Sequence, residues 1–308
     1  TGGIDISIHP QNTDTIYASM WERVRYPSHR TYGGNSSGLY RSYDGGDSWE
    51  QLTNGLPTSE IGRIGIGMSE SNPNIIYSYF MNADRSWNDI YKSTNGGDSW
   101  VHTNSNHNGS YWEGKIQVDP VDPNIAWSMA VSMYKTTNGG QSWQTIQGIW
   151  FDQHTVYVNK QDHNFVIIGN DGGVYISKDG TTTNTKVMTL PITQFYTCER
   201  NYLQPQQIMG GTQDRGTQRT SSGNLDDWYS IWGGDGFIIR VDPTNDKYIY
   251  AASQRGGFVR SANGGNSFYD ARPSNSDPYN WKTPYVLDPS NTRTIYIGSN
   301  KVYKSTNR

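Results

Sequence analysis

The stretch Ser42-Tyr43-Asp44-Gly45-Gly46-Asp47-Ser48-Trp49 decides the fold, because the chain repeats it. Close copies occupy residues 93–100 (Ser-Thr-Asn-Gly-Gly-Asp-Ser-Trp), 136–143 (Thr-Thr-Asn-Gly-Gly-Gln-Ser-Trp) and 261–268 (Ser-Ala-Asn-Gly-Gly-Asn-Ser-Phe). Degenerate copies begin at residues 177, 220 and 305, so the seven starting points, from 42 to 305, lie 41 to 51 residues apart. We call each copy a box. A regular repeat of this length is typical of proteins built from one repeated unit.

Each box belongs to a larger unit with the pattern of four short strands. In the sixth repeat we expect strands at 237–241, 248–252, 257–260 and 267–270, with the turn Asp242-Pro243-Thr244-Asn245 after the first of them. Proline fixes φ in such a turn, and the Asp and Asn side chains cap it. Four short strands per repeat of 40 to 50 residues are typical of a propeller blade. No stretch has a 3.6-residue apolar period, so we expect almost no helix.

The sequence therefore predicts an all-β fold, a seven-bladed β-propeller with four-stranded antiparallel blades. We expect a single domain over residues 1–308, with blades at about 1–54, 55–105, 106–147, 148–190, 191–232, 233–273 and 274–308. The seventh repeat stops before the end of its box, so the last blade should be incomplete. An open strand edge is a liability. We therefore expect the chain to be part of a longer polypeptide, other parts of which supply the missing strand.

The residue types of the box predict a structural role. The Asp or Asn should bind backbone amides, the glycines should allow positive φ, and the Trp or Phe should pack against the neighbouring blade. The consensus Ser/Thr-x-Asp/Asn-x-Gly-x-Ser/Thr-Trp closely resembles the Asp-box, or BNR repeat, of sialidases, sortilin-type receptors, xyloglucanases and bacterial sortilin-like and BNR-repeat proteins. This resemblance covers essentially the whole chain and implies a propeller with Asp-box turns, while the function stays open. The structural positions are Asp44, Trp49, Asn95, Trp100, Asn138, Trp143, Asp179, Asn263 and Phe268.

The composition narrows the class of partner. The formal charge is −3 and only 17% of residues are charged, whereas there are 11 Trp and 22 Tyr, so the surface is polar and aromatic rather than ionic. This argues against a nucleic-acid partner. No apolar run approaches the roughly 18 residues that span a bilayer, so no membrane insertion is expected. The low charge and the Asn, Gly, Ser, Thr, Tyr and Trp bias, together with the resemblance, predict a secreted or cell-surface protein.

Cysteine and histidine usage bears on bound metals. Cys198 is the only cysteine, which excludes an internal disulfide and a cysteine-based zinc cluster, and we expect it to be a small buried hydrophobe. The six histidines show no paired ligand spacing, so no transition metal and no other cofactor is expected. Asp and Asn turns offer the oxygen ligands that calcium takes, and a calcium ion remains an alternative.

Aromatic and charged residues gather in the loops expected at the end of the blades opposite the boxes. Aromatic planes stack on sugars while guanidinium and carboxylate groups bind hydroxyls, and protein ligands use the same side chains. A single Trp, such as Trp150 or Trp232, can instead pack between blades. The ligand-binding candidates are Trp21, Arg23, Arg25, Trp87, Trp112, His154, Arg215, Trp232 and Trp281.

Four aspartates, Asp152, Asp171, Asp214 and Asp235, are candidates for catalysis, because three of them are flanked by glycine near expected strand ends. Two carboxylates that converge there could act as acid and base or nucleophile. The alternative is that each caps a tight turn. The Arg-Ile-Pro segment of sialidases is absent, and the Thr-Asp-x-Gly-Gly segment of xyloglucanases has no match near residues 17–21.

Three functions follow from these patterns. The first is an extracellular propeller that binds a polysaccharide or protein ligand on the face opposite the boxes, as one domain among others of its polypeptide. The second is a glycoside hydrolase that uses paired aspartates. The third is a structural repeat domain of a large surface or filament protein.

Overall fold

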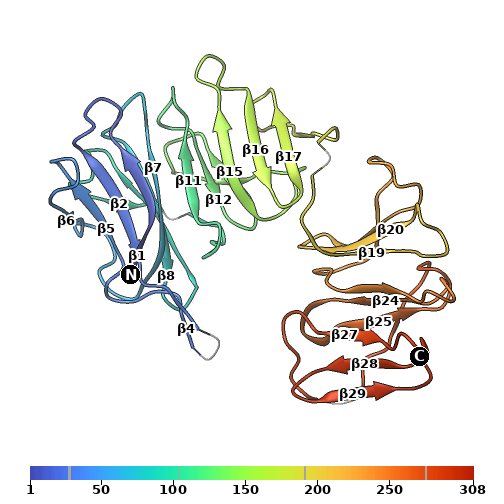
Figure 1. Cartoon of the computed structure of the whole chain (residues 1–308). Coiled ribbons are helices and arrows are strands. Elements are labelled where there is room, and N and C mark those ends of the chain that lie inside the picture. The colour runs from blue at the N-terminus through green and yellow to red at the C-terminus, as the bar shows by residue number, and fades with distance from the viewer. Residues whose placement is uncertain (27–28, 104, 191, 275) are drawn as a thin grey trace. The chain divides into compact units, whose positions relative to one another are not determined.

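The computed structural model describes residues 1–308 except 27, 28, 104, 191 and 275, and it consists of strands and turns (Figure 1). Strands make up 41% of the chain and helix 1%, which confirms the all-β prediction. Among the described residues the one helical segment is the 3₁₀ turn η1 (Gln254–Gly256). The chain divides into two compact units, Thr1–Val187 (unit 1) and Met188–Arg308 (unit 2). The single domain over the whole chain stays a prediction.

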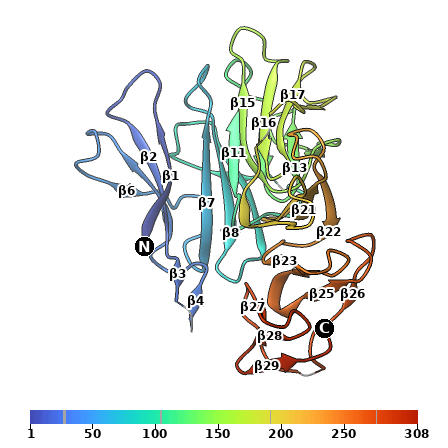
Figure 2. The same ribbon diagram turned by 45° about the vertical axis from the view of Figure 1, so that its right-hand side comes forward.

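Unit 1 holds four antiparallel sheets of four strands, each in chain order. A two-stranded ribbon, β3 (Val24–Arg25) and β4 (Arg30–Thr31), extends from one end of the first sheet (Figure 2). The sheets are β1 (Gly2–Ile8), β2 (Ile16–Trp21), β5 (Gly38–Ser42) and β6 (Glu50–Gln51); β7 (Ile61–Met68), β8 (Ile76–Asn82), β9 (Trp87–Ser93) and β10 (Val101–His102); β11 (Lys115–Val118), β12 (Ala126–Met129), β13 (Met133–Thr136) and β14 (Gln144–Thr145); β15 (Gln153–Val158), β16 (Val166–Asn170), β17 (Gly173–Ser177) and β18 (Thr185–Lys186).

Unit 2 continues the same pattern with two four-stranded sheets and a three-stranded one. Every one of the seven sheets lies inside one predicted segment, because box and strand patterns are both local. The arrangement of the sheets in a ring stays a prediction. The strands are β19 (Phe195–Arg200), β20 (Ile208–Thr212), β21 (Gly216–Thr220) and β22 (Tyr229–Trp232); β23 (Ile239–Val241), β24 (Ile249–Ala252), β25 (Phe258–Ser261) and β26 (Tyr269–Asp270); β27 (Tyr285–Leu287), β28 (Ile295–Gly298) and β29 (Val302–Ser305).

The core lies between consecutive sheets. Strand β8 shows this best, because residues 76–81 are buried on both of its faces. Two tyrosines of that strand place their hydroxyls on backbone acceptors: Tyr77 donates to the carbonyl of Pro123 at 2.9 Å and Tyr79 to that of Ser110 at 3.1 Å. Burying a large side chain contributes roughly 1.5–3 kcal/mol. A chain poor in aliphatic residues can therefore build its core from tyrosine, provided that each hydroxyl finds an acceptor.

Five boxes close their turn with the same hydrogen bonds. In the first box the Ser42 hydroxyl donates to Oδ1 of Asp44 at 2.8 Å, and the amide of Ser48 donates to the same oxygen at 2.8 Å. Gly45 and Gly46 have φ of 71° and 102°, a region open to glycine. The same pair of bonds is centred on Asn95, Asn138, Asp179 and Asn263.

One prediction of burial is wrong, and a second stays a prediction. Within unit 1, Trp49 is 42% exposed, and its packing against a neighbouring blade stays a prediction. Cys198 was expected to be buried, but it is exposed. It lies on β19 between Thr197, whose hydroxyl binds the carbonyl of Phe237, and Glu199, which pairs with Arg240. Alternation along the strand turns the cysteine to the opposite face.

Candidate functional site

Strand order gives every sheet two ends. In an antiparallel sheet with strands in chain order, the first and third turns share one end, and the second turn and the link to the next sheet share the other. The boxes follow the third strands, so we call the first of these the box end and the other the loop end. In unit 1, the described residues 22–26, 29–37, 83–86, 103 and 105–114 belong to the loop end.

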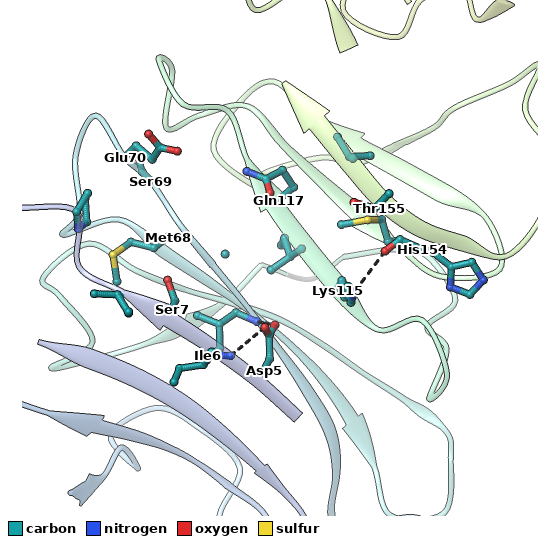
Figure 3. Close-up of a pocket in the computed structure, with 17 residues that line it drawn as sticks. Asp5, Ile6, Ser7, Met68, Ser69, Glu70, Lys115, Gln117, His154 and Thr155 are labelled. Carbon is teal, nitrogen blue, oxygen red and sulfur yellow. Dashed lines mark hydrogen bonds between the residues drawn. The ribbon is translucent and has the colours of Figure 1, made fainter. Parts of the chain in front are cut away.

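A cavity of about 450 Å³ lies in unit 1 along the first strands of its four sheets, β1, β7, β11 and β15 (Figure 3). Two of its polar side chains form hydrogen bonds with the backbone of the strands that line it. The Asp5 carboxylate accepts the amides of Ile6 at 3.0 Å and Ile66 at 2.9 Å. Lys115 donates to the carbonyl of His154 at 3.4 Å. The last two of these contacts join the first strands of neighbouring sheets, so these polar groups stabilise the fold.

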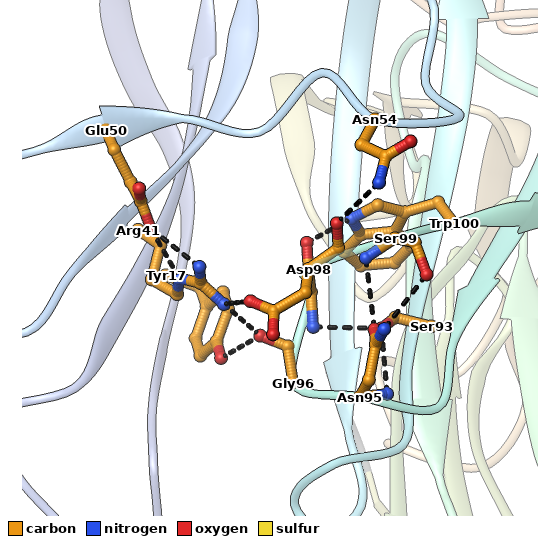
Figure 4. Close-up of polar contacts among 11 residues, drawn as sticks. Tyr17, Arg41, Glu50, Asn54, Ser93, Asn95, Gly96, Asp98, Ser99 and Trp100 are labelled. Carbon is orange, nitrogen blue, oxygen red and sulfur yellow. Dashed lines mark hydrogen bonds and ion pairs between the residues drawn. The ribbon is translucent and has the colours of Figure 1, made fainter.

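At the box end, the second box is held by the sheet before it (Figure 4). Arg41 Nη1 donates to the carbonyl of Gly96 at 2.5 Å and to Asp98 Oδ1 at 2.8 Å, and its Nε donates to Glu50 at 2.8 Å. The Tyr17 hydroxyl donates to the same Gly96 carbonyl at 2.7 Å. The polar groups here satisfy one another, which indicates a structural role.

The hydrogen bond from Arg41 to the next box recurs in other repeats, and the sequence analysis did not identify the basic position that makes it. The residue directly before the first Ser or Thr of a box is basic in six of the seven repeats, the exception being Ile176. Each described contact runs to the carbonyl of the fourth residue of the next box. Besides Arg41 they are Lys92 to Gly139, Lys135 to Gly180, Arg219 to Gly264 and Arg260 to Arg308. The recurring basic residue next to the box was a visible signal for this sheet-to-sheet bond.

The loop end of unit 1 brings together four of the predicted ligand-binding residues, Trp21, Arg23, Arg25 and Trp112. Three more residues, Tyr32, Arg85 and Tyr111, complete what we call the arginine–aromatic cluster. The Arg23 guanidinium lies 4.1 Å from the ring centroid of Tyr32, 5.4 Å from that of Trp21 and 5.5 Å from that of Trp112. Arg25 lies 5.6 Å from the Trp112 ring, and Arg85 lies 4.9 Å from that of Tyr32.

The inner part of this cluster is anchored in the fold. The buried Trp21 donates its indole N–H to the carbonyl of Tyr32 at 2.7 Å, and Arg23 donates to the carbonyl of Thr31 at 2.7 Å. The Tyr111 ring lies edge-on to Tyr32, with centroids 4.8 Å apart. The outer part is open to solvent: Arg25 and Arg85 are exposed, and Trp112 is 49% exposed.

The carboxylates of these loops have other partners. Glu22 accepts the amide and hydroxyl of Ser36 at 3.0 and 2.7 Å, and Asp84 accepts those of Ser86 at 2.8 and 2.6 Å. Within the described part of the chain, no ion pair joins Arg23, Arg25 or Arg85 to a carboxylate. The cluster therefore carries a local excess of positive charge on a chain of net charge −3.

The positive charge of the cluster affects the pKa of the Tyr32 hydroxyl. Burial would raise its pKa, but hydrogen bonds with Arg30 and Arg23, and the positive charges of Arg23 and Arg85, lower it below its ordinary value.

The other predicted ligand-binding residues lie elsewhere. Trp87 packs between Tyr79 and His107, with ring centroids 4.8 and 4.7 Å away. His154 Nε2 lies 2.7 Å from Asp171. In unit 2, Trp232 packs on Phe268 at 5.6 Å, and the half-exposed Trp281 lies 5.9 Å from Phe237 and 5.6 Å from the Arg255 guanidinium. Arg215 belongs to the turn between β20 and β21.

Two of the four candidate catalytic aspartates, Asp214 and Asp235, bring their side chains into contact. Asp235, only 4% exposed, accepts the amide of Asp214 at 2.9 Å and the side chain of Gln254 at 2.7 Å. Burial, together with the charge of Asp214, raises the pKa of Asp235. In unit 1 the amide of Asp171 donates to the carbonyl of Asp152 at 3.4 Å. A carboxyl with a raised pKa beside a second carboxyl has the chemistry of a proton donor.

Within the described residues, no group of three or more His, Cys, Asp or Glu side chains is arranged to hold a metal ion. None of the described helical residues forms a helix long and apolar enough to cross a bilayer.

No protein-family model matches the chain, and no curated protein matches it. Solved structures do. A GH74 enzyme of Niastella koreensis is 17% identical over 99% of this chain and 52% of its own, with a TM-score of 0.45. YCF48 bound to the D1 peptide is 14% identical over 98% and 92%, with a TM-score of 0.41. An ancestral GH74 enzyme is 16% identical over 98% and 44%, with a TM-score of 0.46.

The chain spans about half the length of these GH74 enzymes. At TM-scores under 0.5 such likenesses do not establish a shared architecture, so the fold rests on the seven sheets of the chain itself.

Proposed function

We propose that this chain is an Asp-box β-propeller that works as an extracellular binding module, with a glycan or protein ligand held at the loop end of unit 1. The arginine–aromatic cluster carries this proposal. It presents exposed guanidinium groups and a half-exposed Trp112 on loops anchored by Trp21, whereas the polar groups of the cavity and of the boxes serve the fold. Exposed aromatic and arginine side chains on a fixed base are typical of binding hot spots.

A panel of immobilised polysaccharides and extracellular proteins tests this function with the whole chain. We expect Trp112→Ala to weaken binding to whichever ligand is retained, because it removes the exposed plane of the cluster. The matched control is Tyr157→Ala, which removes a 56% exposed aromatic on β15. Equal affinity of both variants and the unaltered protein for every retained ligand would place the site elsewhere.

A second function, glycoside hydrolysis, is favoured by the contact between Asp214 and Asp235. The buried carboxyl would act as the acid and the exposed one as its partner. Release of reducing ends from the same polysaccharide panel measures this activity. We expect Asp235→Asn to abolish it, whereas Asp171→Asn should leave it unchanged. If no polysaccharide of the panel releases sugar at protein concentrations that show binding, the hydrolase function is rejected and only the binding function is retained.

A further inference from the structure

We infer that the arginine–aromatic cluster takes an acidic polysaccharide, whose carboxylate or sulfate groups bind Arg25 and Arg85 while a sugar face lies on Trp112. This inference rests on the proposed binding function and names the class of its ligand.

The cluster is a row in which cations and rings alternate. Tyr32 lies within 5 Å of both the Arg85 and the Arg23 guanidinium, and Trp112 lies within 6 Å of both Arg23 and Arg25. An acidic polysaccharide alternates in the same way, because each charged sugar offers an apolar face and an anionic group. A row of this kind fits an extended ligand better than one small anion.

The guanidinium groups remain able to bind. A guanidinium that stacks on a ring by its face keeps its N–H edge for an acceptor, and that edge matches a carboxylate with two parallel bonds. Among the described contacts, the side chains of Arg25 and Arg85 make no hydrogen bond and no ion pair, while Arg23 is hydrogen-bonded to Thr31 and to Tyr32. Arg25 and Arg85 are therefore the two positions with most capacity for a ligand.

The positive cluster belongs to a slightly acidic chain. The whole chain has a net charge of −3 and a pI near 6.0, which disfavours the broad electrostatic contact that nucleic acids need. Hydrogen bonds to backbone carbonyls hold Trp21 and Arg23 in place, so the base of the cluster needs little ordering when a ligand binds, and preorganisation of this kind favours affinity.

Titration calorimetry on the full chain with four polymers tests the inference: polygalacturonate for carboxylates, dextran sulfate for sulfate esters, neutral dextran, and poly-L-glutamate for an acidic protein. We expect polygalacturonate or dextran sulfate to bind, with an affinity that falls as salt is raised. Whichever of the two binds more tightly identifies the anionic group.

Variants locate the site. We expect Arg25→Ala and Arg85→Ala each to weaken binding on the order of tenfold, a typical loss for a charge-assisted hydrogen bond. Arg25→Lys keeps the charge but loses the planar guanidinium group, so its affinity should lie between those of Arg25→Ala and the unaltered protein. The control is Lys178→Ala, an exposed lysine at the box end of unit 1 that changes net charge equally.

The outcomes separate the inference from the proposed function. Binding of neutral dextran alone, lost in Trp112→Ala but unchanged in the arginine variants, overturns the acidic ligand and leaves a binding site at the cluster. Tighter binding of poly-L-glutamate than of either acidic glycan overturns the polysaccharide class. Binding of an acidic glycan that Lys178→Ala weakens as much as Arg25→Ala overturns the site as well as its ligand.

Discussion

The first and second boxes have the same internal hydrogen bonds but very different surroundings. Trp49 of the first box is 42% exposed, whereas Trp100 of the second is 3% exposed and packs in a cluster with Tyr17, Leu52 and Leu56. Both indoles donate to a glycine carbonyl of their own box, at 2.9 and 3.0 Å. Within unit 1 the box therefore has the same internal bonds with and without a covering sheet, and we expect its aromatic residue to stabilise the fold where another sheet covers it.

The largest expected effect separates the two tryptophans. Trp100→Ala should lower the free energy of unfolding by about 3–5 kcal/mol, the range for large aromatic truncations in a core. Trp49→Ala should cost only about 1 kcal/mol, because its ring is half in solvent. Denaturant unfolding of the two variants and the unaltered chain measures both. Equal losses would mean that Trp49 is covered in solution.

The third box differs from the first two in having a buried, titratable histidine, His107, beside its tryptophan. The ring of His107 stacks on Tyr134 at 4.0 Å and meets Trp143 of that box at 5.7 Å, and burial lowers its pKa to about 4. An unfolded histidine titrates near 6.5, so between these values the unfolded state binds more protons. Stability should therefore fall by up to about 3 kcal/mol as the pH drops from about 6.5 to 4.

Unfolding measured at pH 7 and pH 5 tests this dependence, and His107→Phe should reduce it. A slope that survives in His107→Phe would assign the acid sensitivity to other groups.

The bond from sheet to box should have an intermediate effect. Arg41→Met removes the hydrogen bonds to Gly96, Asp98 and Glu50. We expect a loss of about 1–2 kcal/mol in unfolding free energy, since both carboxylate partners of the guanidinium are exposed to solvent. Arg25→Met, at the loop end, should change stability by less than about 0.5 kcal/mol, as is usual for surface positions. The reverse order would indicate that the arginine–aromatic cluster is structural.

The smallest effect should be the same in both boxes. Ser42→Ala and Ser93→Ala each remove a buried hydroxyl that donates to the box Asp or Asn and accepts the amide of the second glycine, at 2.9 and 2.8 Å. We expect about 1 kcal/mol for each. Unequal losses, measured side by side in denaturant, would contradict the view that the box turn is independent of its neighbour.

Much of the fold could be predicted because its signals are local. The Gly-Gly turns, the Asp or Asn at the third box position and the alternating strands specify structure within a few residues, and the strands at 249–252 and 258–261 fall within one residue of the expected ones. The fifth box shows the limit. Its third position is serine, and Asp227, five residues further on, binds Thr220 and the amide of Ser222 instead. Because Asp227 lies outside the box, the box residues themselves do not show that it takes the role of the usual Asp or Asn.

The candidate site could be predicted in part. Trp21, Arg23, Arg25 and Trp112 were selected by residue type and loop position, and they come together. Arg85 and Tyr111 belong to the same loops opposite the boxes but are not among the ligand-binding candidates, because their own segments do not show that the loop after β8 and the link before β11 meet over Tyr32.

By itself, the sequence determined the repeat, the strands and the hydrogen bonds that close each box, since these depend on backbone conformation and near neighbours. The tertiary structure alone decided which aromatic residues are buried, which carboxylates meet and which arginines of the described residues form no ion pair. Those properties depend on what lies across from a side chain in the next sheet, often 40 to 60 residues away, as Arg41 and Asp98 show. Two boxes with nearly the same sequence can therefore hold one exposed and one buried tryptophan.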